Sequence, residues 1–225
     1  MGKRLRFWYC RFGGRAKENG FRPARASGVP RAPGPRTPRN STSTLSGIAG
    51  IPYGVYDVAA SEGFVLLACG ADTGELACDA LRRWWLRLGR RHYEGTPRLL
   101  VLADAGGSNG YRVPLFRYGL CGLARQGGVS LRAAHLPPYC SKYNPIDHRL
   151  FCHLARSVGG LLGRSVEAFR DALARTTTTT GLRVIVETAC RFYCAGIKAP
   201  NEFLANEPIV RDLLLPTLNY TAPAL

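Results

Sequence analysis

The sequence has no apolar run close to the roughly 18 residues that a membrane-spanning helix needs, so no transmembrane segment is expected. Arginines interrupt the first twelve residues, MGKRLRFWYCRF, too often for the apolar core of a signal peptide. Cys-x-x-Cys pairs are absent, so the eight cysteines are expected to be small buried residues of a reducing compartment rather than zinc ligands or disulfides. These absences predict a cytoplasmic protein without a membrane partner.

Acidic residues are scarce. The chain of 225 residues contains 15 Asp and Glu against 31 Lys and Arg, which gives a formal net charge of +16. Such an excess indicates a polyanionic partner, most often a nucleic acid. The apolar fraction of 46% is that of a folded protein, and it excludes a wholly disordered or collagen-like chain.

The composition changes abruptly near residue 50. Residues 1–50 contain eleven of the basic residues but a single acid, Glu18, and they are rich in Arg, Pro, Gly and Ser. A segment of this kind cannot bury enough apolar surface to offset the entropy of ordering, so residues 1–50, and 13–47 above all, are expected to be disordered. Three interpretations stay open: a basic arm that binds phosphates, a solvated tail without a role, and an out-of-frame segment.

From Ile51 onward the pattern is that of one folded domain. Short β-prone or apolar runs predict strands at residues 53–56, 63–69, 98–103, 129–135 and 182–187. Apolar residues at helical spacing predict helices over 76–88, 113–125, 144–158 and 165–175, and helical patches within 201–215. Because strands and helices alternate, we expect an α/β fold with a mainly parallel central sheet covered by helices.

The ends of the predicted helices carry recognisable signals. Asp72 with Glu75 forms a capping box before the first helix, in which Trp84 and Trp85 are expected to anchor the core. Gly127 and Gly128 stop the second helix. In the third, Asn144 suits the N-cap, Pro145 the first position and Asp147 the third.

Two carboxylates stand where chemistry is expected. Asp104 follows a buried strand and precedes a loop whose Gly106, Gly107 and Gly110 let a backbone come close, as in a metal-phosphate site at the carboxyl end of a sheet. The alternative is that Asp104 only caps the turn at Ser108–Asn109. Asp147 in turn could serve only the helix start, beside Asn144.

A strand end and a helix start could bring these two carboxylates together. Mg²⁺ takes oxygen ligands, usually one or two carboxylates together with phosphate oxygens. Two such ions assist in-line displacement at phosphorus. With the basic charge, the pair therefore suggests phosphodiester chemistry on nucleic acid.

The segments LLVLADAGGSNGYRVPLFRYGL, HLPPYCSKYNPIDHRLFCHL, TTTTTGLRV and LNYT, in this order, closely resemble a bacterial insertion-sequence transposase of the Rhodopirellula DDE type, a relative of the mariner-like superfamily. The resemblance extends from about Ile51 to Thr221 and also includes IPYGVYDVAASEGFV and ADTGELACDALRRWW. It implies an RNase H-like mixed sheet with flanking helices, and DNA cutting and strand transfer that depend on Mg²⁺ or Mn²⁺. It also implies transposon-end DNA as partner and a possible homo-oligomer.

By this resemblance Asp104 matches the second catalytic acid and Asp147 the third, where the family usually has Glu. Both would bind the metal, and Lys142, His148 and Arg149 beside them would contact DNA. The first acid should lie on an early strand before the PYGVYD segment, and residues 1–50 contain no match. We therefore expect a sheet that is incomplete at its N-terminal strand, in a truncated or frameshifted, inactive copy.

Substitutes for the first acid are Asp57, beside the hairpin that residues 53–56 and 63–69 are predicted to form, and Asp72, at the helix cap. Acid–base roles are conceivable for His135, His148 and His153, although His148 is expected to be an exposed helix residue. The alternative to a transposase domain is a non-enzymatic, basic nucleic-acid-binding protein with an RNase H-like fold. A third carboxylate near Asp104 and Asp147 would discriminate between the two.

Overall fold

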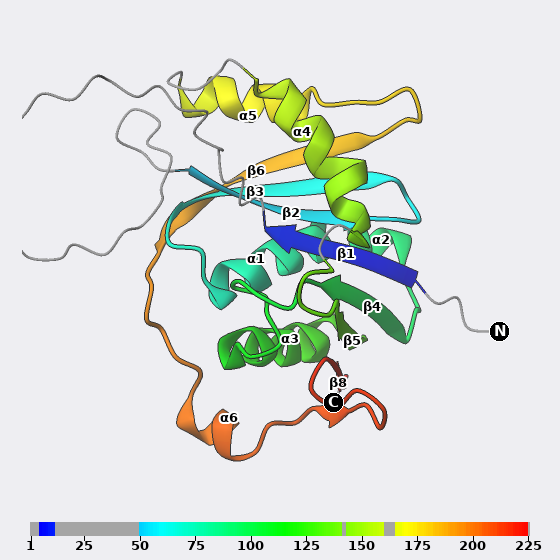
Figure 1. The fold of residues 1–225 in the computed structure, drawn as a ribbon, viewed down its shortest axis with the longest axis vertical. Helices are drawn as coiled ribbons and strands as arrows, with labels where there is room; N and C mark the ends of the chain where they lie inside the picture. The colour runs from blue at the N-terminus through cyan, green and yellow to red at the C-terminus, as the bar shows by residue number, and fades with distance from the viewer. Residues whose placement is uncertain (1–4, 12–49, 141–142, 160–164, 225) are drawn as a thin grey trace, which may run out of the picture.

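A computed structural model describes residues 5–11, 50–140, 143–159 and 165–224. In this part of the chain eight strands form one sheet (Figure 1). They are β1 (Leu5–Arg11), β2 (Gly50–Asp57), β3 (Glu62–Gly70), β4 (Arg98–Ala103), β5 (Ser130–His135), β6 (Arg183–Tyr193), β7 (Val210–Arg211) and β8 (Asn219–Ala222). Their order across the sheet is β6-β3-β2-β1-β4-β5-β8-β7.

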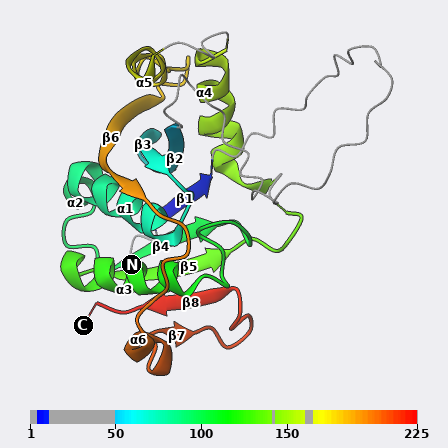
Figure 2. The ribbon, with the colours of Figure 1, turned by 90° about the vertical axis from the view of Figure 1, so that its left-hand side faces the viewer.

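Helices cover both faces of this sheet, as Figure 2 shows for α1 and α3 on one side and α4 on the other. Their bounds are α1 (Gly74–Trp84), continued by the π-helical turn η1 (Trp85–Gly89) and α2 (Arg90–His92), then α3 (Pro114–Gly127), the π-helical turn η3 (Asp147–Phe151), continued by α4 (Cys152–Ser157), α5 (Val166–Ala174) and α6 (Asn201–Ala205). No helix within the described ranges has both the length and the apolar character that crossing a bilayer requires.

The sheet is mixed rather than mainly parallel. β1 runs parallel to β4, β4 to β5 and β3 to β6, whereas the β1–β2, β2–β3, β5–β8 and β7–β8 pairs are antiparallel. The expectation of a mainly parallel sheet is therefore wrong. The hairpin of β2 and β3 was predicted and is confirmed, whereas the antiparallel pairs that β1 makes with β2 and that β8 makes with β5 and β7 were not.

The sheet was expected to be incomplete at its N-terminal strand, but an N-terminal strand is present. Leu5–Arg11 forms β1, which lies between β2 and β4, with Tyr9 level with both Val55 and Ala103. Its sequence, LRFWYCR, is rich in the aromatic residues that favour strands. The segment expected to be disordered thus contributes a central strand. Residues 13–47, the Arg- and Pro-rich stretch, lie outside the described residues.

Two apolar cores form because β3 is buried on both faces. Phe64, Leu66 and Ala68 of β3 pack with α1 and α3, while Val65 and Leu67 face the opposite core. The first core includes Trp84 and Trp85, at 1% and 7% exposure, and confirms the anchoring role predicted for both. The second is closed by four side chains of the η3–α4 helix, Ile146, Leu150, Phe151 and Leu154.

The predicted helix ends are close to the observed ones. α1 is capped by Thr73 instead of Asp72, because the Thr73 hydroxyl accepts the hydrogen bond from the Leu76 amide at 3.2 Å. α3 ends as predicted, with Gly128 in the left-handed conformation at φ 61°.

Candidate functional site

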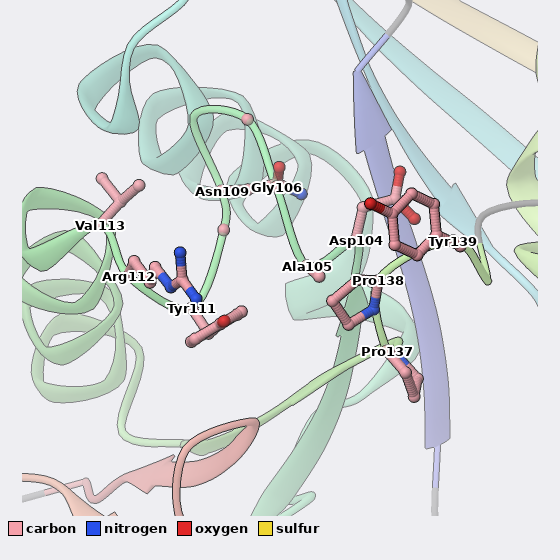
Figure 3. Close-up of a pocket in the computed structure, with 12 residues that line it drawn as sticks. Asp104, Ala105, Gly106, Asn109, Tyr111, Arg112, Val113, Pro137, Pro138 and Tyr139 are labelled. Carbon is pink, nitrogen blue, oxygen red and sulfur yellow. The ribbon is translucent and has the colours of Figure 1, made fainter.

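Asp104 is the first residue after β4, at the carboxyl end of a central strand. The loop that follows it forms one wall of a pocket of about 670 Å³ (Figure 3). The rest of the lining includes Tyr111, Arg112, Pro138 and Tyr139. Figure 3 places Asp104 and Tyr139 at one end of this pocket and Arg112 and Tyr111 at the other. The pocket is thus an open hollow with a carboxylate at one end and a guanidinium at the other.

Buried polar groups hold the loop after Asp104 in place. The ring nitrogens of His135, which is 5% exposed, lie 3.0 Å from the carbonyl oxygen of Asn109 and 2.9 Å from that of Leu218. Burial lowers the pKa of His135 below its ordinary value, although the two carbonyl contacts act in the opposite direction. His135 therefore fixes the pocket wall, and the acid–base role considered for it is not supported by its position.

Asp147 begins the turn η3 and is tied to Asp104 through one residue. The side-chain amide of the fully buried Asn144 donates to Asp104 Oδ1 at 3.0 Å. The backbone amide of Asp147 donates to the carbonyl of the same Asn144 at 3.1 Å. Asn144 thus starts the helix, as its sequence position predicts, and also orients the carboxylate of Asp104.

The helix of Asp147 lies against the sheet at two glycines. A Cβ atom on Gly54 of β2 would lie 2.6 Å from Phe151 Cε1, and one on Gly63 of β3 would lie 2.5 Å from Leu150 Cδ1. Figure 1 shows α4 crossing β2 and β3. The absence of side chains at these positions lets the helix approach closely, and so sets the height of Asp147 above the sheet.

The two carboxylates influence each other electrostatically. Burial raises the pKa of Asp147, and the negative charge of Asp104 raises it further, while His148 acts in the opposite direction. A cation offsets the repulsion between two carboxylates that act on each other, and oxygen ligands of this kind suit Mg²⁺ or Mn²⁺. Among the described residues no group of three or more His, Cys, Asp or Glu side chains has the geometry of a metal site.

The remaining predicted site residues are placed as follows. His148 and Arg149 are exposed on the turn that carries Asp147, and His153 is half-buried in α4. None of the three lines the pocket beside Asp104. Lys142 lies outside the described residues.

Asp57 is excluded as a substitute first acid by its surroundings. It is fully buried at the end of β2, where its carboxylate accepts hydrogen bonds from the Tyr93 hydroxyl at 2.6 and 2.8 Å. The amides of Ala59 and Ala60 also donate to it, both at 3.0 Å. In register Asp57 is level with Val101 through β1, three residues before Asp104 along β4. Its role is to close the β2–β3 turn.

The second substitute, Asp72, follows the carboxyl end of β3, and two strands, β2 and β1, separate β3 from β4. β1, which lies between β2 and β4, has the sequence LRFWYCR and contains no Asp or Glu. Among the described residues, the one strand that precedes the PYGVYD segment therefore has no carboxylate.

Sequence reasoning missed the aromatic and basic lining of the pocket. Tyr111, Arg112 and Tyr139 have no periodic or motif signal, because they lie in loops that only the folded chain brings together. The Arg112 guanidinium lies 5.1 Å from the centroid of the Tyr111 ring, in cation–π contact. The one available signal was the Pro137-Pro138 pair, which marks a rigid turn before Tyr139.

A comparison with protein families connects this geometry with a known domain. The model of the Rhodopirellula transposase DDE domain matches residues 41–224. The chain belongs to this family. The match covers every described strand except β1, and it begins ten residues before the boundary expected from composition at Ile51.

Membership of the Rhodopirellula transposase DDE domain family has direct consequences. A DDE domain implies an RNase H-like fold, which agrees with the mixed sheet and its flanking helices. DDE transposases typically use a divalent metal ion, and they bind DNA. No curated protein matches the chain.

Proposed function

We propose that this domain descends from an insertion-sequence transposase that cuts transposon ends and joins them to new DNA, with Asp104 and Asp147 as its metal-binding carboxylates. The observation that carries the proposal is the link from Asp104 through Asn144 to Asp147, at the carboxyl end of a central strand in a DDE family member. In α/β sheets this edge is where ligands bind.

The residues present fit a divalent cation in part. Asn144 orients the carboxylate of Asp104, and the pKa of Asp147 is raised first by burial and then by the charge of Asp104, which a cation would offset. When bound, the cation would activate an attacking hydroxyl or water and stabilise the leaving oxygen at phosphorus. Mg²⁺ commonly binds one or two carboxylates and completes its shell with water and substrate phosphate.

The side chains around this pair have complementary tasks. Asn144 holds Asp104 in one orientation, since its amide is buried and has the carboxylate as partner. Arg149 and His148, exposed on the turn of Asp147, are placed to bind DNA phosphates, and Lys142 is proposed for the same role. Arg112 offers a further guanidinium across the pocket. Phosphate contacts of this type position DNA without reading its sequence.

We propose further that the chain by itself does not cleave DNA. The neighbouring strand β1 has no acid, and the two nominated substitutes stand elsewhere, one of them fully engaged at the β2–β3 turn. Two carboxylates hold one cation weakly and leave a second without a bridging ligand, and Mg²⁺ tolerates little departure from octahedral geometry. The domain is then a DNA-binding remnant of a transposase.

Strand cleavage tests this proposal. Radiolabelled transposon-end DNA is incubated with the full chain and with the variant Asp104→Ala, in Mg²⁺ and in Mn²⁺, while DNA binding is followed in parallel. We expect both proteins to bind DNA and neither to cut it. Cleavage by the wild-type chain that disappears in Asp104→Ala would show that another carboxylate or a partner chain completes the site. Absence of DNA binding would contradict the proposed function altogether.

A further inference from the structure

Tyr139 stands in a backbone conformation that a glycine would favour. The amide of Cys140 donates to the carbonyl of Pro137 at 3.1 Å, which closes a turn with Pro138 and Tyr139 at its centre. Tyr139 has φ 67°, in the left-handed region. With proline at the first central position and positive φ at the second, such turns usually have glycine or asparagine there, because a Cβ atom is strained.

The Tyr139 ring gains no burial in return for this strain. Its exposed fraction is 99%, whereas the tyrosines of the core, Tyr53, Tyr193 and Tyr220, are at most 1% exposed. A large aromatic ring on a strained, solvent-facing turn contributes nothing to folding that glycine would not supply better. Strained residues of this kind gather at functional sites.

The turn stands at the reaction site. Tyr139 lines the same pocket as Asp104. Pro137 and Pro138 stiffen the approach to the turn, and the Leu136 amide ties it to Ala103, the residue before Asp104, at 2.8 Å. The backbone of this turn is therefore tied to the strand end that carries Asp104, and it presents the ring of Tyr139 to solvent at the pocket.

We propose that Tyr139 is a stacking platform for an unpaired DNA base beside the scissile phosphate. The proposal rests on the proposed function and adds to it the state of the DNA that the pocket accepts. An exposed aromatic face stacks on any base that has left the duplex, whereas bases inside a duplex are already stacked on each other. Arg112, across the pocket, supplies the cation for a neighbouring phosphate.

The experiment compares two DNA ligands of equal length, a blunt duplex and a duplex with a short single-stranded extension, by fluorescence anisotropy in Ca²⁺ with the full chain. The decisive variant is Tyr139→Gly, since glycine suits the positive φ and the melting temperature should stay equal or rise. We expect affinity for the extended duplex to fall about tenfold, or about 1.4 kcal/mol, and affinity for the blunt duplex to change less than about twofold.

Two further variants and one optical signal sharpen the result. Tyr139→Phe keeps the ring and should bind both ligands like the wild type. Phe192→Ala removes an aromatic side chain that is 68% exposed on β6, away from the pocket, and should also leave binding unchanged. A 2-aminopurine base in the extension should be quenched by the wild type but not by Tyr139→Gly.

The outcomes separate this inference from the proposed function. If the wild type binds both ligands and Tyr139→Gly weakens neither, or weakens both equally, the stacking role is wrong while DNA binding stands. If the wild type binds neither ligand, the proposed function fails and the stacking role fails with it.

Discussion

Asn144 shows how one buried amide can serve structure and site together. Its carbonyl starts the helix of Asp147 and its side chain holds Asp104, so two carboxylates from distant parts of the sequence depend on one residue. Another buried carboxylate, that of Asp57 at the end of β2, accepts hydrogen bonds from the Tyr93 hydroxyl and from the amides of the β2–β3 turn. The contrast separates a structural aspartate from a site aspartate by what surrounds each of them.

Tyr93→Phe should destabilise the chain. The hydroxyl that donates to Asp57 is lost, and the fully buried carboxylate keeps the amides of its turn, with the imidazole of His92 3.8 Å away. Under-satisfied buried polar groups destabilise by about 1–3 kcal/mol. Urea denaturation measures the free energy of unfolding. Tyr118→Phe, at a side chain that is 40% exposed, is the matched control and should change it by less than about 0.5 kcal/mol.

His135 should make the stability depend on pH. Its pKa in the folded chain is lowered by burial, so the unfolded state takes up a proton first as the pH falls. The stability that neutral His135 contributes is complete above about pH 6.5, its ordinary pKa, and is lost progressively as the pH falls below that value. Urea titrations between pH 7.5 and about pH 5 should show a smaller decline for His135→Asn than for the wild type. Equal declines would contradict this assignment.

At the scale of elements, the close approach of α4 to the sheet depends on residues without side chains. Gly54 and Gly63 occupy neighbouring antiparallel strands directly under Phe151 and Leu150. The contact carries the first turn of that helix, and with it Asp147, to the level of the strand end. A shift of the helix therefore changes the separation of the two site carboxylates.

Gly54→Ala and Gly63→Ala should each destabilise the chain by about 1–3 kcal/mol, because an added methyl group overpacks the buried contact. Gly122→Ala is the control, since a Cβ atom there meets nothing within 4 Å in α3. It should be neutral or stabilise by about 0.5–1 kcal/mol. Thermal or urea unfolding of the three variants checks the ranking, and a Gly63→Ala variant as stable as Gly122→Ala would contradict it.

Periodicity and turn chemistry were enough to predict most elements from residue 51 onward. The helix start at Asn144 and the stop at Gly128 follow from short-range hydrogen bonding, which adjacent residues disclose, while the start at Thr73 was predicted one residue early, at Asp72. The β2–β3 hairpin was predicted, but β1 and the return of β8 were not, because their pairing partners lie far apart in sequence and a basic composition masked the strand-forming LRFWYCR. Asp104 and Asp147 stood out by position, whereas Tyr139 and Arg112 join the pocket only through folding.

On the scale of the whole molecule, the described strands form one sheet in which β1, a central strand, has no carboxylate. β1 pairs with β4 in parallel, with Tyr9 level with Ala103, so an extension of this register by one residue would bring Cys10 level with Asp104.

Cys10→Asp should therefore strengthen metal binding. A carboxylate level with Asp104 adds a third charged oxygen ligand, and affinity for hard cations rises with the number of such ligands. We expect Mn²⁺ to bind at least about tenfold more tightly, with the gain lost in the double variant Cys10→Asp with Asp104→Asn. Calorimetric titration of the full chain measures this. A gain that persists in the double variant would show that the new carboxylate acts elsewhere.

The central claim is that Asp104 and Asp147 together form a divalent-cation site, and Mn²⁺ binding followed by electron paramagnetic resonance tests it most directly. Titrations compare the wild type with Asp104→Asn, Asp147→Asn and the control Asp171→Asn, whose side chain is 51% exposed on α5. The account predicts weak binding by the wild type and the control, and its loss in each of the other two variants. Equal Mn²⁺ binding by all four proteins would contradict it.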